Sequence, residues 1–386
     1  MLARIVALAG FSIALSLLGA CTGGDPVSPT PAGRAASAGP AADAADRSDS
    51  VASTAAFVEA MRPTGEGLPV VAVLASNEGT EMTDLLLPHA LLVRADVAEV
   101  SIVAPRAGSV ELYPALRIDG ARSLADFDRA HPSGADYVIV PAMSRDDDPE
   151  LIAWLRRQAD EGARILGVCS GARVLGQAGL LDGRRFTGHW YDRSVLLRRP
   201  GATWVPDRRY VSDRGVATTT GVSASGPAML ALVEAIGGRD RARALARELG
   251  VDSWDSSHDS ARFGLGVRFA STYVVDKLAF WRNERWQLAV EDGVDDIALA
   301  LVADAWSRTG RVRVVAASDS GSVRLRSGLK LATAIVEGDA RSIALDAALE
   351  PVPQLDRTLL RIAERFGEAR AERVMQEIEY PGSRRR

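Results

Sequence analysis

The sequence predicts an α/β fold: a doubly wound parallel sheet with helices on both faces, followed by a degenerate partial α/β repeat. Short apolar runs alternate with segments of helical periodicity, which is typical of a parallel sheet. The run Val70–Leu74 is continuously apolar, as in a strand buried on both faces, and a later apolar strand leads directly into Cys169. At 386 residues, the chain is long enough for about two domains.

Composition excludes some function classes. The chain is 47% hydrophobic and 25% charged, which is an ordinary globular balance. Its net charge of −4 lacks the basic excess that nucleic-acid binding requires, so we expect no nucleic-acid partner. The four histidines show no zinc-ligand spacing, and we expect neither a metal nor a cofactor.

The N-terminus has the pattern of an export signal. Residues 1–20 place Arg4 before an apolar run, Ile5–Leu18, that is too short to span a bilayer. Leu18-Gly19-Ala20-Cys21 follows and resembles the lipobox of bacterial lipoproteins, which implies lipidation of Cys21. The expected location is the cell envelope, lipid-anchored to a membrane and facing the periplasm or exterior. An uncleaved short anchor or a plain secretory signal are the alternatives.

Residues 21–67 are dominated by Ala, Ser, Gly, Pro, Thr and Asp and show no apolar period. Such a segment cannot bury enough surface to order itself, so we expect a disordered tether, with a short helix over 51–61.

Residues 68–263 are expected to form the first domain. The apolar pattern predicts strands and helices in alternation over 70–74 (strand), 83–95 (helix), 100–104 (strand), 137–141 (strand), 148–162 (helix), 164–168 (strand) and 172–178 (helix).

Residues 264–386 are expected to repeat part of that pattern. The segment 312–331 aligns with 100–118 after one inserted residue, and both contain Gly-Ser-Val and a later Leu-(Arg/Lys)-(Ile/Leu). This favours a truncated, chemically silent duplication, with chance likeness between two αβ segments as the alternative. A charged helix over 357–379 is expected to close the chain.

The sharpest motif is Gly167-Val168-Cys169-Ser170-Gly171. A buried strand that enters a tight turn before a helix has the geometry of a nucleophile elbow. Gly171 would let the helix pack close to the strand, and the helix N-terminus would lower the pKa of the Cys169 thiol. A buried structural cysteine is the alternative.

Two segments resemble the ThiJ/PfpI family of the class I glutamine-amidotransferase-like superfamily. They are the residues around this turn, GVCSGARVLGQAGLLDGRRFTGHW (167–190), and a later stretch, TTGVSA (219–224). The likeness is nearest to the branch found in AraC-type regulators and isonitrile hydratases, and it covers about residues 69–250. It implies a flavodoxin-like fold and a cysteine-dependent site.

The resemblance suggests partners for Cys169. Asp84, four residues before Pro88, matches the family carboxylate that contacts the cysteine and is expected to transfer protons. His189 follows Cys169 by 20 residues, as in the family motif, and is a candidate catalytic residue. Glu81 and His258 are candidates for the surrounding pocket, and Glu81 would share a helix face with Asp84.

Three departures from the family narrow the function. Ser170 stands where peptidase relatives have histidine, so peptidase activity is disfavoured. Ala142 replaces an expected glycine, which puts the oxyanion hole in doubt. No helix-turn-helix pattern follows, so a regulator role is not carried over.

We therefore expect an envelope-anchored, cysteine-dependent hydrolase or hydratase acting on a small molecule. A non-catalytic protein that binds a small molecule or senses redox state is the main alternative, and a scaffold for another envelope protein is a third. If the second half mimics a dimer partner, the chain should be a monomer.

Overall fold

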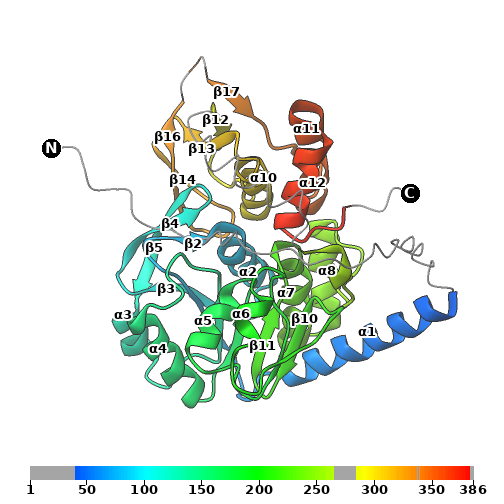
Figure 1. The fold of residues 1–386 in the computed structure, drawn as a ribbon. Coiled ribbons are helices and arrows are strands. Elements are labelled where there is room, and N and C mark those ends of the chain that lie inside the picture. The colour runs from blue at the N-terminus through cyan, green and yellow to red at the C-terminus, as the bar shows by residue number, and fades with distance from the viewer. Residues whose placement is uncertain (1–39, 265–283, 337, 339, 383–386) are drawn as a thin grey trace, which may run out of the picture.

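The computed structural model describes residues 40–264, 284–336, 338 and 340–382 (Figure 1). The predicted signal peptide, the predicted lipidation site Cys21 and residues 22–39 lie outside the described part. No helix among the described residues is long and apolar enough to cross a membrane.

A large sheet forms the centre of the molecule. Within the described residues its strands are β1 (Val70–Leu74), β2 (Thr80–Glu81), β3 (Glu99–Ala104), β4 (Gly108–Tyr113), β5 (Arg117–Ser123), β6 (Tyr137–Val140), β7 (Arg164–Gly167), β10 (Tyr210–Asp213), β11 (Val216–Thr219), β14 (Ser322–Arg324) and β15 (Lys330–Ala332). Their order is β10-β11-β7-β6-β1-β3-β5-β15-β14, and β4 pairs with both β2 and β5. The pairs from β11 to β5 are parallel, whereas β10 and the β14–β15 hairpin are antiparallel.

Helices cover both faces of this sheet, which confirms the predicted fold class (Figure 1). The helices are α1 (Pro40–Ala60), α2 (Met82–Ala95), α3 (Leu124–Ala130), α4 (Pro149–Asp160), α5 (Gly171–Gln177), α6 (Arg193–Leu196), α7 (Val222–Gly237), α8 (Arg239–Leu249), α10 (Asp296–Arg308), α11 (Pro351–Phe366) and α12 (Glu368–Glu377), with a 3₁₀ turn at Ser260–Arg262. A small pair, β8 (Arg185–Phe186) and β9 (Thr203–Trp204), lies outside the main sheet.

Alternate residues of the central strands enter two separate hydrophobic cores. In β1, Val71 and Val73 join the core under α2 and α7, whereas Ala72 and Leu74 join the core under α3, α4 and α5. This two-sided burial is the reason that the strands read as continuous apolar runs.

Helix α1 corrects the predicted tether. Residues 40–60 are helical, so the expected disorder over 21–67 does not extend through this segment, and the helix is longer than the expected 51–61. Phe57 and Met61 are buried in the first core, and the Phe57 ring meets the Tyr210 ring edge-on at 4.7 Å. These two apolar side chains hold the helix against the domain.

The C-terminal part builds a second sheet of β12 (Glu284–Ala289), β13 (Val312–Ser318), β16 (Ala334–Ile335) and β17 (Arg341–Ile343) in the order β16-β13-β12-β17. All three pairings are parallel. The closing helix predicted over 357–379 is instead two helices, α11 and α12. They meet at Gly367, whose φ of 90° is a conformation that glycine readily adopts.

The β14–β15 hairpin leaves this second part and extends the main sheet. Lys330 pairs with Asp119 and Leu331 with Ile118 across the antiparallel junction of β15 with β5. Helix α10 also packs on α2, so residues far apart in the sequence form one continuous body (Figure 1).

Candidate active site at Cys169

Cys169 lies in the turn between β7 and α5. Its φ of 53° is in the left-handed region, which is uncommon for a residue with a side chain and is typical of a strained elbow. Its backbone N–H donates to Oγ1 of Thr219 at 3.1 Å, which ties the turn to the end of β11. The thiol is buried, with 7% of the residue exposed.

Gly171 lets the turn close. A Cβ at this position would lie 1.9 Å from the carbonyl oxygen of Val140 on the neighbouring strand β6. Real Cβ atoms do not approach that closely, so the first turn of α5 can pack on β6 only if residue 171 is glycine. Gly171 was predicted to pack on the strand that leads into the turn, and its close contact is with the neighbouring strand β6.

Asp84 lies in the first turn of α2 and is fully buried. Its Oδ2 accepts the N–H of Ala142 at 3.2 Å, while Oδ1 has no hydrogen-bond partner among the described residues. Burial raises the Asp84 pKa well above its usual value, and the neighbouring Glu81 carboxyl raises it further. Both effects favour the protonated form of the Asp84 carboxyl.

Glu81 precedes α2 as its N-cap instead of sharing a helix face with Asp84. Its carboxylate accepts the N–H of Asp84 at 2.6 Å and the hydroxyl of Thr83 at 2.7 Å. Its other oxygen, Oε1, accepts from Nη2 of Arg308 at 2.7 Å. Burial, followed by the Asp304 carboxyl, raises the Glu81 pKa to about 7 despite Arg308.

Arg308 reaches this group from α10, in the half of the chain predicted to be chemically silent. Its Nε donates to Asp304 at 2.7 Å, and its Nη1 lies 3.9 Å from Glu377. Burial also raises the pKa values of Asp304 and Glu377. The buried Arg308 guanidinium thus forms ion pairs with Glu81, Asp304 and Glu377. No sequence pattern predicted this cluster, because its members lie on distant segments of the chain.

The pKa of the Cys169 thiol is shifted in the direction opposite to the prediction. Burial raises its pKa well above the usual value, and the carboxyl groups of Asp84, Glu81, Asp192 and Glu379 raise it in that order. The expected lowering by the α5 N-terminus is outweighed, because α5 is short and the carboxyl groups oppose a thiolate. In this structure the thiol is neutral at neutral pH.

Ser170 and Ala142, which were also predicted to belong to the site, both hydrogen-bond to carboxyl groups. The Ser170 hydroxyl donates to Asp192, whose other oxygen lies 3.4 Å from Arg173. Ala142 donates its N–H to Asp84, so this group is not free for an oxyanion in the structure as it stands.

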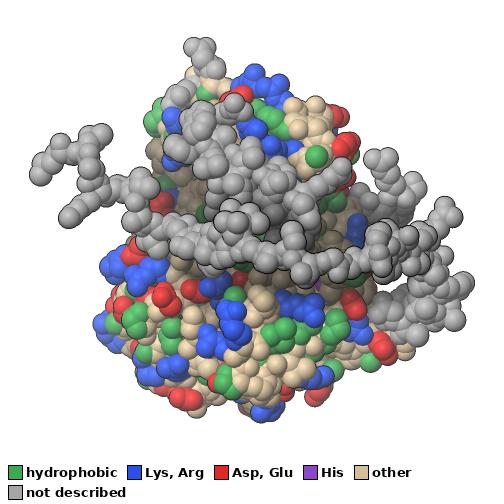
Figure 2. Space-filling model, viewed as in Figure 1, with side chains coloured by type: hydrophobic (Ala, Val, Ile, Leu, Met, Phe, Trp, Pro, Cys, Tyr) green, Lys and Arg blue, Asp and Glu red, His purple; other side chains and the backbone are tan. Residues whose placement is uncertain are grey.

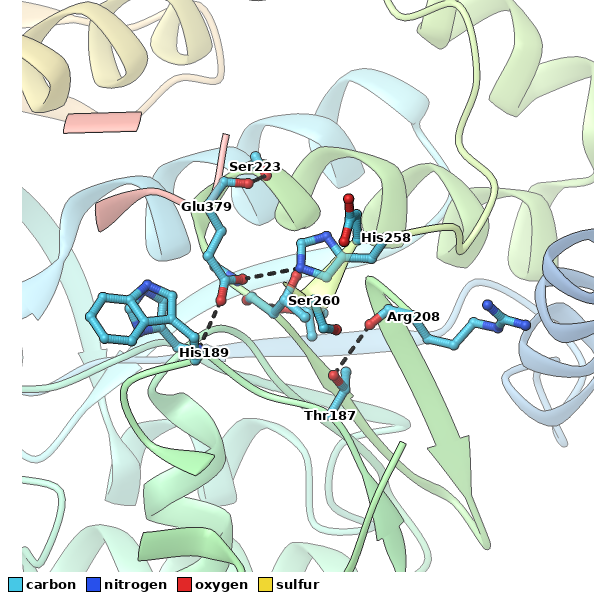
Figure 3. A network of polar contacts seen from close by, with 12 residues as sticks. Thr187, His189, Arg208, Ser223, His258, Ser260 and Glu379 are labelled. Carbon is cyan, nitrogen blue, oxygen red and sulfur yellow. Dashed lines mark hydrogen bonds and ion pairs between the residues drawn. The ribbon is translucent and has the colours of Figure 1, made fainter. Parts of the chain in front are cut away.

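The two predicted histidines face the C-terminal segment (Figure 3). His189 donates from Nε2 to the carbonyl of Glu377 at 2.9 Å and accepts the N–H of Tyr191 on Nδ1 at 3.3 Å. Nε2 of His258 lies 3.9 Å from Oε2 of Glu379, and its ring stacks on Phe263. His189 is buried and His258 is partly buried, and the catalytic role of His189 stays a prediction.

Two cavities of the described residues lie away from Cys169. One, of about 700 Å³, is lined by the α1–β1 connection and the end of α7, and another, of about 380 Å³, is lined by the loop 130–136 and its neighbours. Over the described ranges, no three His, Cys, Asp or Glu side chains are arranged to hold a metal ion. Basic and acidic side chains are interspersed on the face in Figure 2.

The fold and the elbow define an α/β protein with a buried cysteine in a strand-to-helix turn and buried carboxyl groups in the same region. Residues 70–235 match the DJ-1/PfpI family, so this part of the chain is a DJ-1/PfpI domain. It is similar to the isonitrile hydratase of Pseudomonas putida, with 36% identity over 31% of this chain and 49% of that protein. It also resembles the HTH-type transcriptional regulator GlxA of Rhizobium meliloti, with 40% identity over 42% of this chain and 49% of that protein.

The chain spans at most about half the length of these curated relatives. Among solved structures, a ThiJ/PfpI family protein from Pseudomonas syringae is 26% identical, with a TM-score of 0.43 over 48% of this chain and 76% of that one. DJ-1beta of Drosophila melanogaster is 20% identical, with a TM-score of 0.44 over 48% of this chain and 99% of that one.

Proposed function

We propose that the protein is a cysteine-dependent hydratase or hydrolase of a small molecule, with Cys169 as nucleophile and Asp84 as proton-transfer partner. The observation that carries the proposal is the buried Asp84 carboxyl, whose Oδ1 has no partner among the described residues and which interacts electrostatically with the Cys169 thiol. A buried polar atom without a partner costs free energy, and active sites are where such costs are found. The partial similarity to an isonitrile hydratase supports the reaction class.

The pair is suited to a reaction that begins with two neutral groups. With an isonitrile, Asp84 would donate its proton to the terminal carbon while Sγ of Cys169 bonds to that carbon. The thiol proton then passes to the Asp84 carboxylate, which leaves a thioimidate and restores the acid. One water molecule hydrolyses the thioimidate to the N-substituted formamide and the free thiol. No net charge is buried at any stage, which suits a site where carboxyl groups disfavour a thiolate.

The test is turnover of alkyl isonitriles, nitriles and amides by the full-length protein, with product measured by mass spectrometry. We expect formamide from the wild type and a loss of at least about 100-fold in Cys169→Ala and Asp84→Asn, the size usual for general acid–base residues. Asp182→Asn removes an exposed carboxylate of the same domain and should be neutral. Equal rates in wild type and Cys169→Ala for every substrate would overturn the proposal.

A non-catalytic, ligand-binding protein is the second candidate. The observation that favours it is the closed state of the site, since Cys169 is 7% exposed and its neutral thiol is a poor nucleophile. The same observation disfavours redox sensing, which requires an accessible thiolate.

We propose further that Cys21 is lipidated and anchors the protein in the cell envelope. The pattern Leu18-Gly19-Ala20-Cys21 after a short apolar run supports this. Labelling with a fatty-acid analogue in a bacterial host should tag the wild type and not Cys21→Ser. Equal labelling of both forms would contradict it.

We also propose that the C-terminal half takes the place of a dimer partner. The matching strand register of the β4–β5 and β14–β15 hairpins supports a duplication that relates the two halves of the chain. Val110 pairs with Ile118 in β4–β5, and Val323 pairs with Leu331 in β14–β15. These residues correspond in the alignment of 100–118 with 312–331.

A further inference from the structure

The C-terminal segment 376–380 lies over the loops beside Cys169. Nε1 of Trp190 donates to the Gln376 carbonyl at 3.0 Å, and the N–H of Ser223 donates to the Ile378 carbonyl at 3.1 Å. The Ser223 hydroxyl donates to the Glu379 carbonyl at 2.6 Å. The segment is thus hydrogen-bonded at several points to the loop 189–191 and to the start of α7 at 221–223 (Figure 3).

The Glu379 carboxylate is held by backbone N–H groups. Oε1 accepts from Trp190 at 2.8 Å and Oε2 from Gly221 at 2.5 Å. Gly221 is the N-cap of the 16-residue helix α7, whose partial positive charge favours an anion there. The side chain is 2% exposed, and of the described residues only His258 lies within ion-pair distance, at 3.9 Å. The backbone N–H groups of Trp190 and Gly221 therefore form an anion-binding site, which the Glu379 carboxylate occupies.

The space next to Gly221 is filled by the Glu379 side chain and leaves no room for a side chain at residue 221. A Cβ on Gly221 would lie 2.9 Å from Cβ of Glu379, so glycine leaves the space that the carboxylate arm occupies. Glu379 itself has a φ of 51°, in the left-handed region that non-glycine residues rarely adopt. The chain thus accepts an unfavourable backbone conformation in order to place this carboxylate.

The anion site adjoins the nucleophile. Thr219, whose hydroxyl accepts the N–H of Cys169 at 3.1 Å, is two residues before Gly221. Glu379 also interacts electrostatically with the thiol. A carboxylate bound in place of Glu379 would therefore lie close to the turn that carries Cys169.

We propose that Glu379 occupies a carboxylate subsite of the Cys169 site. The ligands of this site are then small molecules with a carboxylate group, and segment 376–380 is a built-in competitor that must withdraw before they bind. This inference rests on the proposed function for its reaction, but the subsite can be tested without turnover.

The test compares alkylation of Cys169 by iodoacetate and by iodoacetamide, which have nearly the same size and differ in charge. In both reactions Sγ bonds to the methylene carbon, iodide leaves, and the thiol proton passes to buffer. The full-length protein is used, and the Cys169 peptide is quantified by mass spectrometry because Cys21 is a second thiol. Circular dichroism verifies that each variant is folded.

We expect both reagents to react faster with Glu379→Ala than with the wild type, because the segment is released. The ratio of the iodoacetate rate to the iodoacetamide rate should rise about tenfold, because charge-assisted hydrogen bonds to the freed N–H groups favour the anion. Any change in the thiol pKa acts on both reagents and cancels in the ratio. Glu379→Gln keeps the shape and should also raise the ratio, which provides a second variant. Glu368→Ala, an exposed acid at the start of α12, should behave as the wild type.

A protection experiment completes the design. Propionate should slow the alkylation of Glu379→Ala by iodoacetamide, and the isosteric propionamide should not. An unchanged reagent ratio in both Glu379 variants, or equal protection by the acid and the amide, would overturn the subsite. Absence of turnover with a raised ratio would instead reject the proposed function and leave the subsite standing.

Discussion

Ile118 and Leu331 are direct neighbours across the antiparallel junction of β5 with β15. The two residues also correspond in the alignment of the two halves. An antiparallel pair of equivalent residues is what a two-fold axis produces at the centre of a symmetric interface. The N–H of Leu112 donates to Leu116 at 3.0 Å and the N–H of Leu325 to Leu329 at 2.7 Å, which repeats the same turn in both halves.

The first prediction is that the protein is a monomer. The β14–β15 hairpin covers the β5 edge that a second copy would otherwise pair with. Light scattering after gel filtration should give the mass of one chain at all accessible concentrations. A concentration-independent dimer would contradict the proposal that the second half replaces a partner.

Replacing Arg308 with Met should destabilise the protein more at high pH than at low pH. Removing one partner of a buried ion pair costs about 3–5 kcal/mol when the remaining group stays charged. The folded-state pKa of Glu81 is about 7, above its unfolded value of 4.5, so its contribution to stability falls as the pH rises between these values. Without Arg308 this loss becomes larger.

Denaturant unfolding at pH 5 and pH 8 measures the effect. Arg313→Met, an exposed arginine on β13, is the control and should change stability by less than about 0.5 kcal/mol at both pH values. An equal loss for Arg308→Met at pH 5 and pH 8 would show that the carboxyl groups near Arg308 do not titrate in this range.

Removing the Asp84 carboxyl should make Cys169 more reactive at alkaline pH. Burial holds the thiol pKa high and Asp84 is the largest electrostatic contributor, so Asp84→Asn should lower it. The rate of iodoacetamide alkylation, followed from pH 6 to pH 11, gives the thiol pKa directly. We expect a wild-type midpoint above the free value of about 8.5. A midpoint below that value would mean that the resting site holds a thiolate.

Gly171→Ala should be far more damaging than Gly226→Ala. The first change forces a Cβ to within 1.9 Å of a backbone oxygen, and the second places one in open space on α7. We expect loss of at least about 3 kcal/mol or failure to fold for Gly171→Ala, at the upper end of single-residue effects. Gly226→Ala should be neutral or stabilise by about 1 kcal/mol. Thermal unfolding of both variants tests the contrast, which similar melting temperatures would refute.

Local signals in the sequence predicted the central strands, the helix carrying Asp84 and the Cys169 turn. The strand over 70–74 was predicted with its observed limits, because apolar runs and turn residues are local properties. The burial of Arg308 beside Glu81 and of Glu379 beside Gly221 depends on contacts across 227 and 158 positions. Composition also failed over 40–60: Phe57 of this helix and Met61 just after it are buried in the core, and Thr54 accepts a hydrogen bond from the Tyr210 hydroxyl at 3.2 Å.

Helix α1 limits the length of chain between Cys21 and the domain. At most residues 22–39 separate Cys21 from helix α1, which is described from Pro40. Nineteen steps of 3.3–3.6 Å give a maximum reach of about 65 Å, whereas a tether through residue 67 would allow more than twice that length. A lipid on Cys21 would therefore confine Cys169 to a thin layer of solvent at the membrane surface. The site would then sample molecules that enter or leave across that membrane in preference to those in the bulk.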